Sequence, residues 1–500
     1  MKRFVESLTE NQRFLQTALP AEDVLYFPFS SADGVACLLV YADGLVNKQL
    51  LGELAIQPLK QTSLLANKRQ NDGGKVALNA NEVAQLLLFP EVKELEKTAD
   101  AQQEILDGNT VLLIDGLSSA LMIGAKLLPV RAVTEPPTDV AVKGPREGFI
   151  EDVKVNMTLL RKRLKTPDLQ LKISRLGKQS ATMICLCYLD GIADNSVLQT
   201  VEKRLQSIEL DAVPDSSYVA ALLSGRRHSV FRSVGTTERP DVFAAKLVEG
   251  RVGVLVDGSP IALTVPFVAV EDFQSNEDYY VSPVMATIFR LLRLISVLVA
   301  LLLPALYVCT QLFKMQLLPL GLTLTIAESV SRLPLSPSLE MFVVLFVLEV
   351  LKEASIRMPK YVGMSLSVVG ALVLGEAAVS AGFLSTPTII VVAFSGICLY
   401  AVPNFVETGS ILRWLFLAVA GSFGPFGLTL AVGFVLYYMI TADNFNTPLL
   451  APFAPLTPHD LKDAIAKYEL TELSTRPLIF RSKNRTRLKI KGEKGESNEK

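Results

Sequence analysis

The sequence predicts an α/β cytoplasmic N-terminal region of two small modules, followed by an α-helical multi-span membrane domain. Half of the 500 residues are hydrophobic, which is a high share for a soluble protein. Charge is spread unevenly, because residues 283–440 contain 14 charged side chains in 158 positions whereas 20% of the whole chain is charged. Before about Tyr280, strand-like and helix-like apolar patterns alternate. We therefore expect a boundary near this residue, with the lipid-facing part downstream.

The first residues and the composition argue against several classes of protein. The opening segment is polar and has the pattern of an amphipathic helix rather than the apolar core of a signal peptide, so we expect the α/β region to stay in the cytoplasm. The net charge of −1 gives no overall field that would favour nucleic acid. Five cysteines without a second closely spaced pair argue against a disulfide framework or a metal site. We interpret them as buried apolar residues, with Cys185 and Cys187 on one face of a strand.

Residues 1–130 form the predicted first module. Its strands are bounded by turn residues, and its helices show the spacing of one apolar face. We expect strands at 25–30, 36–46, 110–117 and 120–130, the last two as a hairpin, and helices at 49–56, 81–89 and 93–106.

Residues 131–282 form the predicted second module. A helix from Phe149 carries one apolar face and ends before Pro167. Its other face carries the basic residues Lys154, Arg161, Lys162, Arg163 and Lys165. After it we expect strands at 169–177 and 181–189, helices at 196–208 and 238–250, and a closing hairpin at 251–268.

The segment 143–150, KGPREGFI, precedes that helix and raises the question of a phosphate site. It lacks the lysine–hydroxyl pair of a Walker A loop, and its proline removes one backbone donor. Two interpretations remain. The segment is either a structural turn whose acidic neighbours complement the helix N-terminus, or a hinge that contacts a neighbouring subunit. The candidate hinge residues are Gly144, Pro145, Arg146, Glu147, Gly148 and Phe149.

Residues 283–440 form the predicted membrane domain, with about four to six spans by hydrophobic length. The first span ends near Phe313 and follows Arg290 and Arg293, whose positive charge favours the cytoplasmic side. Proline-rich residues 317–338 indicate a re-entrant or interfacial piece. The other apolar stretches are 341–359, 361–382, 386–403 and 411–440, the last interrupted by a GPFG sequence.

The last 60 residues pose a question of topology. Five full spans would place residues 441–500 outside, whereas seven basic residues and one acid between Arg481 and Lys494 favour a cytoplasmic tail facing anionic lipid. A re-entrant segment would restore an even number of crossings, and so would a sixth crossing created by the GPFG break. We favour the cytoplasmic tail.

The stretch 361–382 has small residues at helical spacing, which allow close approach of helices in lipid. Two interpretations remain open: plain helix packing, or the lining of a narrow path in an oligomer. An acid in the same segment is costly in lipid and is therefore a functional candidate. The pore-lining candidates are Gly363, Ser367, Gly370, Ala371, Gly375, Glu376 and Ala378. Glu349 is a weaker candidate, because its charged neighbours place it near the interface.

Nothing in the sequence indicates an enzyme, a cofactor or a metal. The two histidines, His228 and His459, lie near neither a cysteine nor a cluster of carboxylates. Motifs of serine hydrolases, zinc proteases and EF-hands are absent.

Several long segments of the chain resemble one known family: 135–169, 187–205, 237–266, 277–293, 301–308, 351–359, 367–382 and 449–456. Together they resemble the GerA family of spore germination proteins, the A subunits of GerA-type germinant receptors. Two departures from the family pattern are Glu376, where many relatives have glutamine, and residues 443–450, DNFNTPLL.

The resemblance implies a multi-pass protein of the spore inner membrane that acts in germination. It implies an oligomeric ring, a pentamer, around an ion path that releases monovalent cations when nutrient binds. A transporter-like B subunit would sense the nutrient, and a lipoprotein C subunit would complete the receptor. A sporulation paralogue of the SpoVAF type is the alternative within the family. A non-conducting scaffold is an alternative of another class, whereas a secondary transporter is disfavoured because no inverted repeat is found.

Overall fold

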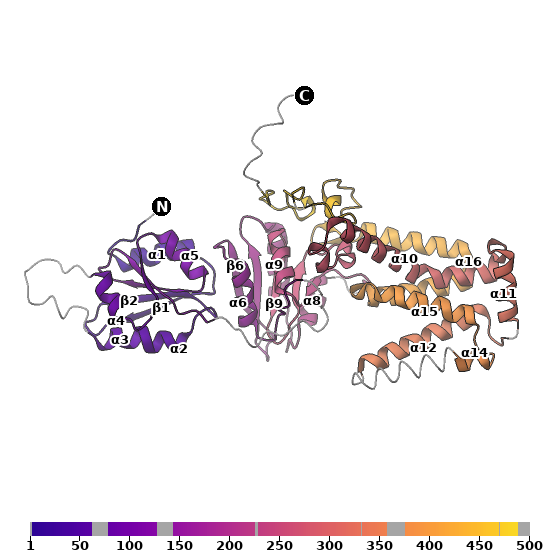
Figure 1. The fold of residues 1–500 in the computed structure, drawn as a ribbon, viewed down its shortest axis with the longest axis horizontal. Helices are drawn as coiled ribbons and strands as arrows, with labels where there is room; N and C mark the ends of the chain where they lie inside the picture. Colours follow the sequence, from indigo (N-terminus) through magenta and orange to yellow (C-terminus); the bar gives the residue numbers. More distant parts are fainter. Residues whose placement is uncertain are drawn as a thin grey trace, which may run out of the picture.

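The computed structural model describes residues 3–62, 79–127, 144–225, 229–331, 333–357, 376–469 and 471–488. Three regions follow one another along the long axis of the molecule (Figure 1): a first sheet with its helices, a second sheet with its helices, and a helical region. The last described residues lie beside the second sheet and the start of the helical region. An α/β region with two sheets followed by a helical part is the coarse architecture that the sequence predicts.

The first sheet is antiparallel, with the strand order β1-β2-β4-β5-β3. Alternate residues of β2 face opposite sides, so that Leu38 and Val40 lie in one core and Cys37 and Leu39 in the other. Helices α1 and α5 cover the first face, and α2 to α4 cover the second. The bounds are β1 Val24–Ser30, β2 Ala36–Ala42, β3 Val92–Leu95, β4 Thr110–Ile114, β5 Ala120–Ile123, α1 Leu8–Ala18, α2 Lys48–Leu51, α3 Gln57–Gln61, α4 Ala80–Leu86 and α5 Thr98–Leu106.

The expected hairpin at 110–130 is confirmed by the pairing of β4 with β5. The expected helix at 93–106 is wrong in its first part, because Val92–Leu95 is a strand and the helix begins at Thr98. Lysine, glutamate and leucine favour helix by local propensity. Here the free edge of β5 offers backbone partners to β3, and that pairing outweighs the local preference.

The second sheet is also antiparallel, with the order β6-β7-β9-β10-β8. Helices α6 and α9 cover one face, and α7 and α8 cover the other. Cys185 and Cys187 share the first face, as predicted, and their Sγ atoms are 3.7 Å apart. All five cysteines are buried and free. The bounds are β6 Leu169–Leu176, β7 Thr182–Leu189, β8 Gly235–Thr237, β9 Val252–Val256, β10 Ala262–Val265, α6 Val153–Arg163, α7 Asn195–Gln206, α8 Ser216–Ser224 and α9 Pro240–Val248.

Helix α6 differs from the prediction in two respects. It begins at Val153 rather than at Phe149, because the side chain of Asp152 caps it by accepting from two backbone N–H groups. Arg161 does not lie on a solvated basic face. Its side chain is 1% exposed and pairs with Asp23 of the first sheet region at 2.7 Å. This buried ion pair therefore connects the two α/β regions.

Two helices of the described residues are long and apolar enough to cross a membrane, Pro283–Phe313 and Pro403–Thr441. Shorter apolar helices lie between them, and many large apolar side chains of this region face outward. The predicted stretch 361–382 lies mostly outside the described residues. The bounds are α10 Pro283–Phe313, α11 Leu320–Val330, α12 Pro337–Arg357, α14 Ala378–Ser380, α15 Thr386–Tyr400 and α16 Val406–Thr441.

Helix α16 reverses at the GPFG sequence. Gly424 has non-helical angles (φ 66°, ψ −155°) and lies against Phe313 at the far end of α10. Near the start of α16, the hydroxyl of Thr408 donates to the carbonyl of Val230 at 2.8 Å, and just after its end Asn444 donates to Ser233. Both ends therefore reach the same loop of the second sheet region. Each half of about 17 residues is about 26 Å long, close to the apolar thickness of a bilayer.

Residues 442–488 fold back onto the second sheet region. The side chain of Arg476 donates to the carbonyl of Val248, and the backbone of Lys483 donates to Ile192. The short strands β11 Asp443–Asn444 and β12 Thr447–Pro448 pair at the start of this segment. The described part of the basic tail therefore lies at the same end of the helical region as the two sheets.

Candidate functional site

A buried cluster of charges lies where the second sheet region, the start of α10 and the C-terminal segment meet. Its centre is Asp278, which is 0% exposed and belongs to the 3₁₀ turn η4, Asn276–Tyr279. Arg290 donates to it at 3.0 Å, and Arg293 donates to both of its carboxylate oxygens at 2.9 and 3.0 Å. Asp278 also accepts from the backbone N–H of Ser275, which fixes the turn. We call the contacts among Asp278, Arg290, Arg293 and Asp463 the junction cluster.

The C-terminal segment supplies the second acid of the junction cluster. Arg290 donates to a carboxylate oxygen of Asp463 and to its backbone carbonyl, both at 2.9 Å. The hydroxyl of Tyr279 donates to the other carboxylate oxygen at 2.9 Å. Lys467 donates to the backbone carbonyl of Asp278. Asp278 and Asp463 thus each accept hydrogen bonds from an element other than their own. Such charged partners offset the cost of burying a carboxylate.

A second ionic contact fixes the linker between β10 and α10. Glu271, in the 3₁₀ turn η3 (Ala269–Phe273), pairs with Lys246 at 2.8 Å and with Arg251 at 2.6 Å. Burial alone would raise the pKa of Glu271, but the two cations outweigh this effect and hold that pKa at about 2. The guanidinium of Arg251 lies over the ring of Phe480 at 4.2 Å, so the C-terminal segment covers the same contact.

The KGPREGF segment is connected to this junction. Gly144 has φ +114°, and a Cβ there would come within 2.6 Å of the ring of Tyr280, so only glycine fits. The carbonyl of Pro145 accepts from Arg239 at 2.9 Å. Arg239 pairs with Asp241, which also accepts from the hydroxyl of Tyr280 at 3.1 Å.

Asp241 is the link between this segment and η4. Its Oδ2 atom accepts from Asn276 at 3.1 Å, two residues before Asp278. Burial would raise the pKa of Asp241, but the hydrogen bond and charge of Arg239 outweigh it, and the net pKa is lowered. Polar contacts therefore run from Pro145 through Arg239 and Asp241 to Asn276, and the backbone of η4 joins Asn276 to Asp278 of the junction cluster.

The rest of the predicted hinge is held within its own chain. Glu147 pairs with Lys162 at 2.8 Å and with Arg163 at 2.9 Å, and its hydrogen bond to Lys162 lowers its pKa. Phe149 is buried and packs edge-on against Phe243, with ring centroids 5.6 Å apart. Gly148 is buried as well, whereas Arg146 is exposed. The contact with a neighbouring subunit stays a prediction.

Comparison with known proteins decides the family. The sequence model described as "GerA: Bacillus/Clostridium GerA spore germination protein" matches residues 12–479. This chain belongs to the GerA family. The resemblance found in the sequence is thereby confirmed, and the homologues are spore germination proteins.

Two relatives illustrate how far the similarity extends. The chain is 32% identical over 480 residues to "Uncharacterized membrane protein YfkQ" of Bacillus subtilis (strain 168), covering 95% of this chain and 90% of that protein. It is 32% identical to "Spore germination protein B1" of the same organism, covering 91% and 93%. The crystal structure of the N-terminal domain of the A subunit of the Bacillus megaterium spore germinant receptor GerK3 is 25% identical, with a TM-score of 0.41, over 53% of this chain and 96% of that chain.

Most of the pore-lining candidates of this GerA-family chain lie outside the described residues: Gly363, Ser367, Gly370, Ala371 and Gly375. Glu376 is described and exposed. Ala378 opens α14 and packs partly buried beside the apolar cluster of Met341. The structure therefore does not test whether these residues line one path. His228 is also outside the described residues, and His459 contacts Asp460 and Thr475.

Glu349, the weaker candidate, belongs to a polar cluster between α12 and α16. It accepts from Arg413 at 2.8 Å and from Ser410 at 2.9 Å, and it pairs with Lys352. Arg413 is fully buried and also donates to Ser395 of α15 at 3.2 Å. This cluster holds three helices together near the end of the helical region that faces the sheets.

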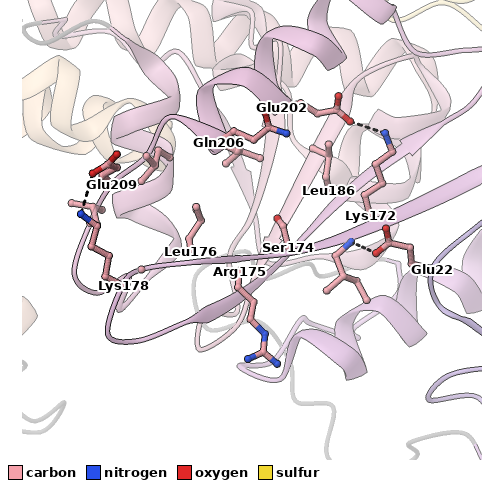
Figure 2. A pocket seen from close by; sticks show the side chains of 15 residues that line it. Glu22, Lys172, Ser174, Arg175, Leu176, Lys178, Leu186, Glu202, Gln206 and Glu209 are labelled. Atoms are coloured by element: carbon pink, nitrogen blue, oxygen red, sulfur yellow. Dashed lines mark hydrogen bonds and ion pairs between the residues drawn. The ribbon is translucent and has the colours of Figure 1, made fainter.

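A pocket of about 570 Å³ lies along the free edge of β6 (Figure 2). Four of its charged side chains form two ion pairs: Lys172 with Glu202 at 2.7 Å, and Lys178 with Glu209 at 3.0 Å. Glu22 reaches in from the first sheet region and accepts from the backbone of Ile173 at 2.8 Å. The lining residues include neither histidine nor cysteine. The pocket offers no nucleophile–base arrangement and gives no support to an enzymatic function.

Sequence reasoning found Arg290 and Arg293 as flanking charges but missed their partners. Asp278 stands in a polar stretch whose acids look alike in the sequence, and Asp463 is 173 residues away from Arg290. The sequence held a weak signal of this cluster: two arginines lie one turn apart at the start of an apolar helix. If such arginines are buried, they need acidic partners.

Proposed function

We propose that this chain is the A subunit of a nutrient germinant receptor in the spore inner membrane, and that it transmits a signal from its α/β region to its helices. The homologues named as spore germination proteins support the biological process. The observation that carries the transmission is the series of contacts from Pro145 through Arg239, Asp241 and Asn276 to the turn that contains Asp278. Because these members are paired, and Arg239, Asp278 and Arg290 are buried, we expect a movement of the α/β region to displace the start of α10.

The proposal includes a multi-pass helical domain that forms an oligomeric ring with an ion path for monovalent cations. The reversal of α16 at Gly424 supplies two passes, and the C-terminal segment at the sheet end is consistent with an even number of crossings. On this topology the sheets and the tail face the cytoplasm. The outward-facing apolar side chains of the helical region fit contact with lipid or with neighbouring copies.

A transporter-like B subunit and a lipoprotein C subunit complete the proposed receptor, and the ring is a pentamer. The pore-lining candidates, with Glu376 among them, keep their proposed roles, and so does the hinge around Arg146. Arg146 is exposed, whereas Phe149 of the same segment is buried and packs against Phe243.

The experiment is potassium release from liposomes that contain this chain with its B and C partners. We expect nutrient-triggered release from the wild type and altered release for Glu376→Gln. The matched control is Glu353→Gln, since Glu353 is exposed and pairs only with Arg357 within α12 among the described residues. An assembled wild-type complex that releases no potassium with nutrient would establish a scaffold instead of a channel.

A further inference from the structure

Glu340 is a carboxylate buried in the helical region. It lies in the first turn of α12 and is 0% exposed. One oxygen, Oε1, accepts from the backbone N–H of Ser385 at 2.6 Å. The other, Oε2, has no hydrogen-bond partner among the described residues, and no ion pair between described residues includes Glu340. A lone buried carboxylate is so unfavourable that a proton or a bound cation must neutralise it.

Polar side chains of α15 and α10 lie near this carboxylate. The hydroxyls of Ser385 and Thr388, at the start of α15, are 2.9 Å apart, and both side chains are buried. The side chain of Tyr307, on α10, interacts with both of them and lies in the field of Glu340. Tyr307 accepts from the amide nitrogen of Gln311 at 2.8 Å. The amide oxygen of Gln311 is a second buried acceptor, and it has no hydrogen-bond partner in the described part of the chain.

The surroundings of the site are apolar. Met341, Val344 and Leu345 of α12 pack with Val308 and Leu384 in one buried cluster around it. The site lies towards the far end of the helical region, because α10 ends at Phe313, which contacts the turn of α16 at Gly424. It is therefore separate from the junction cluster and from the polar cluster of Glu349, which lie towards the sheets.

We propose that Glu340, Tyr307, Ser385, Thr388 and Gln311 bind one monovalent alkali cation. A proton would satisfy a single acceptor, whereas several oxygens coordinate one alkali cation, and on this proposal the unpartnered oxygens of Glu340 and Gln311 both do so. The group offers oxygen only, which suits hard cations rather than transition metals. It holds one carboxylate, which balances a single positive charge, whereas calcium and magnesium sites usually use more carboxylates or waters.

The proposal does not rest on the channel function, because a structural cation in a scaffold would use the same atoms. Its test therefore measures binding and not flux. The full chain is purified in detergent, and its thermal midpoint Tm is measured in sodium, potassium and choline chloride at equal ionic strength. We expect a higher Tm in sodium or potassium than in choline, by roughly 1–4 °C once the cation is about tenfold above its Kd.

Glu340→Gln keeps the size of the side chain and removes its charge. We expect this variant to lose the difference between alkali salts and choline while its Tm in choline is at least that of the wild type. The matched control is Glu353→Gln on the same helix, which we expect to keep the full cation dependence. Should Glu340→Gln not fold, Thr388→Val provides the second variant, and we expect it to need a several-fold higher cation concentration for the same rise.

Three outcomes overturn the proposal. Equal wild-type Tm values in the three salts would exclude a cation. A midpoint that depends on pH but not on the alkali cation would show a protonated Glu340 instead. A cation dependence that survives both Glu340→Gln and Thr388→Val would place the cation elsewhere. This test does not measure potassium release. A failure of the channel proposal would therefore leave the result of the cation-binding test unchanged.

Discussion

The two interfaces of the α/β region are built differently. The first and second sheet regions are joined by separate contacts: a buried ion pair of Asp23 with Arg161, a more exposed ion pair of Asp107 with Lys165, and a hydrogen bond from the backbone of Ile173 to Glu22. The second sheet region and the helices are joined by the junction cluster, in which two acids and two arginines share partners from three elements. Separate pairs can hold two bodies in place. A shared cluster also makes the position of each element depend on the others, as a transmitting contact requires.

The largest expected effect comes from removing the centre of the junction cluster. Asp278→Ala removes the buried acid that Arg290 and Arg293 share and leaves Arg290 with Asp463 as its acidic partner in the cluster. Breaking a buried ionic contact in this way costs about 3–5 kcal/mol. We expect a large fall in Tm and in the yield of folded protein, measured by thermal unfolding in detergent. A Tm within error of the wild type would mean that the junction does not contribute to stability.

The buried ion pair between the two sheet regions provides the direct comparison. Arg161→Met leaves Asp23 buried and unpaired, and we expect a loss of about 3 kcal/mol. The double variant Arg161→Met with Asp23→Asn removes both charges and should recover most of that loss, because no unpaired charge remains. A double-mutant cycle measures the coupling. Single and double variants of equal stability would contradict the pairing.

The acid of the linker predicts a pH dependence of stability. The folded-state pKa of Glu271 is about 2, below its ordinary value of 4.5. The ionised Glu271 therefore contributes fully to the free energy of unfolding above about pH 4.5. This contribution, about 3 kcal/mol in total, is lost as the pH falls towards 2. We expect Tm to fall over this range in the wild type and to fall less in Glu271→Gln. Identical acid profiles for the two proteins would contradict the assignment.

The smallest effect concerns the glycine that touches the junction from the KGPREGF segment. Gly144→Ala meets both a positive φ and the ring of Tyr280, and we expect a loss of about 1–3 kcal/mol. The matched control is Gly34→Ala, which has a positive φ of 76° but open space around it. The difference between the two variants isolates the contact with Tyr280. Equal losses of stability in the two variants would show that backbone strain alone causes the effect.

Local patterns predicted much of the fold. The alternation around Cys185 and Cys187 placed both on one buried face, and the GPFG sequence marked the reversal of α16. Contacts between distant residues were not predictable in the same way. Arg161 follows the polar spacing of α6, and only the neighbouring sheet region brings Asp23 to it. Glu340 looked like one more polar residue near a helix start, because nothing local shows that Ser385 and Tyr307 enclose it.

The central claim is that the contacts between the KGPREGF segment and the junction cluster transmit the signal. The most direct test is nutrient-triggered potassium release by the receptor complex with Asp241→Asn, because Asp241 links Arg239 and Tyr280 to Asn276 without belonging to the junction cluster itself. Assembly is measured on the same samples by co-purification of the partners. The account predicts a complex that assembles and releases potassium several-fold more slowly. Assembly together with wild-type release would contradict it.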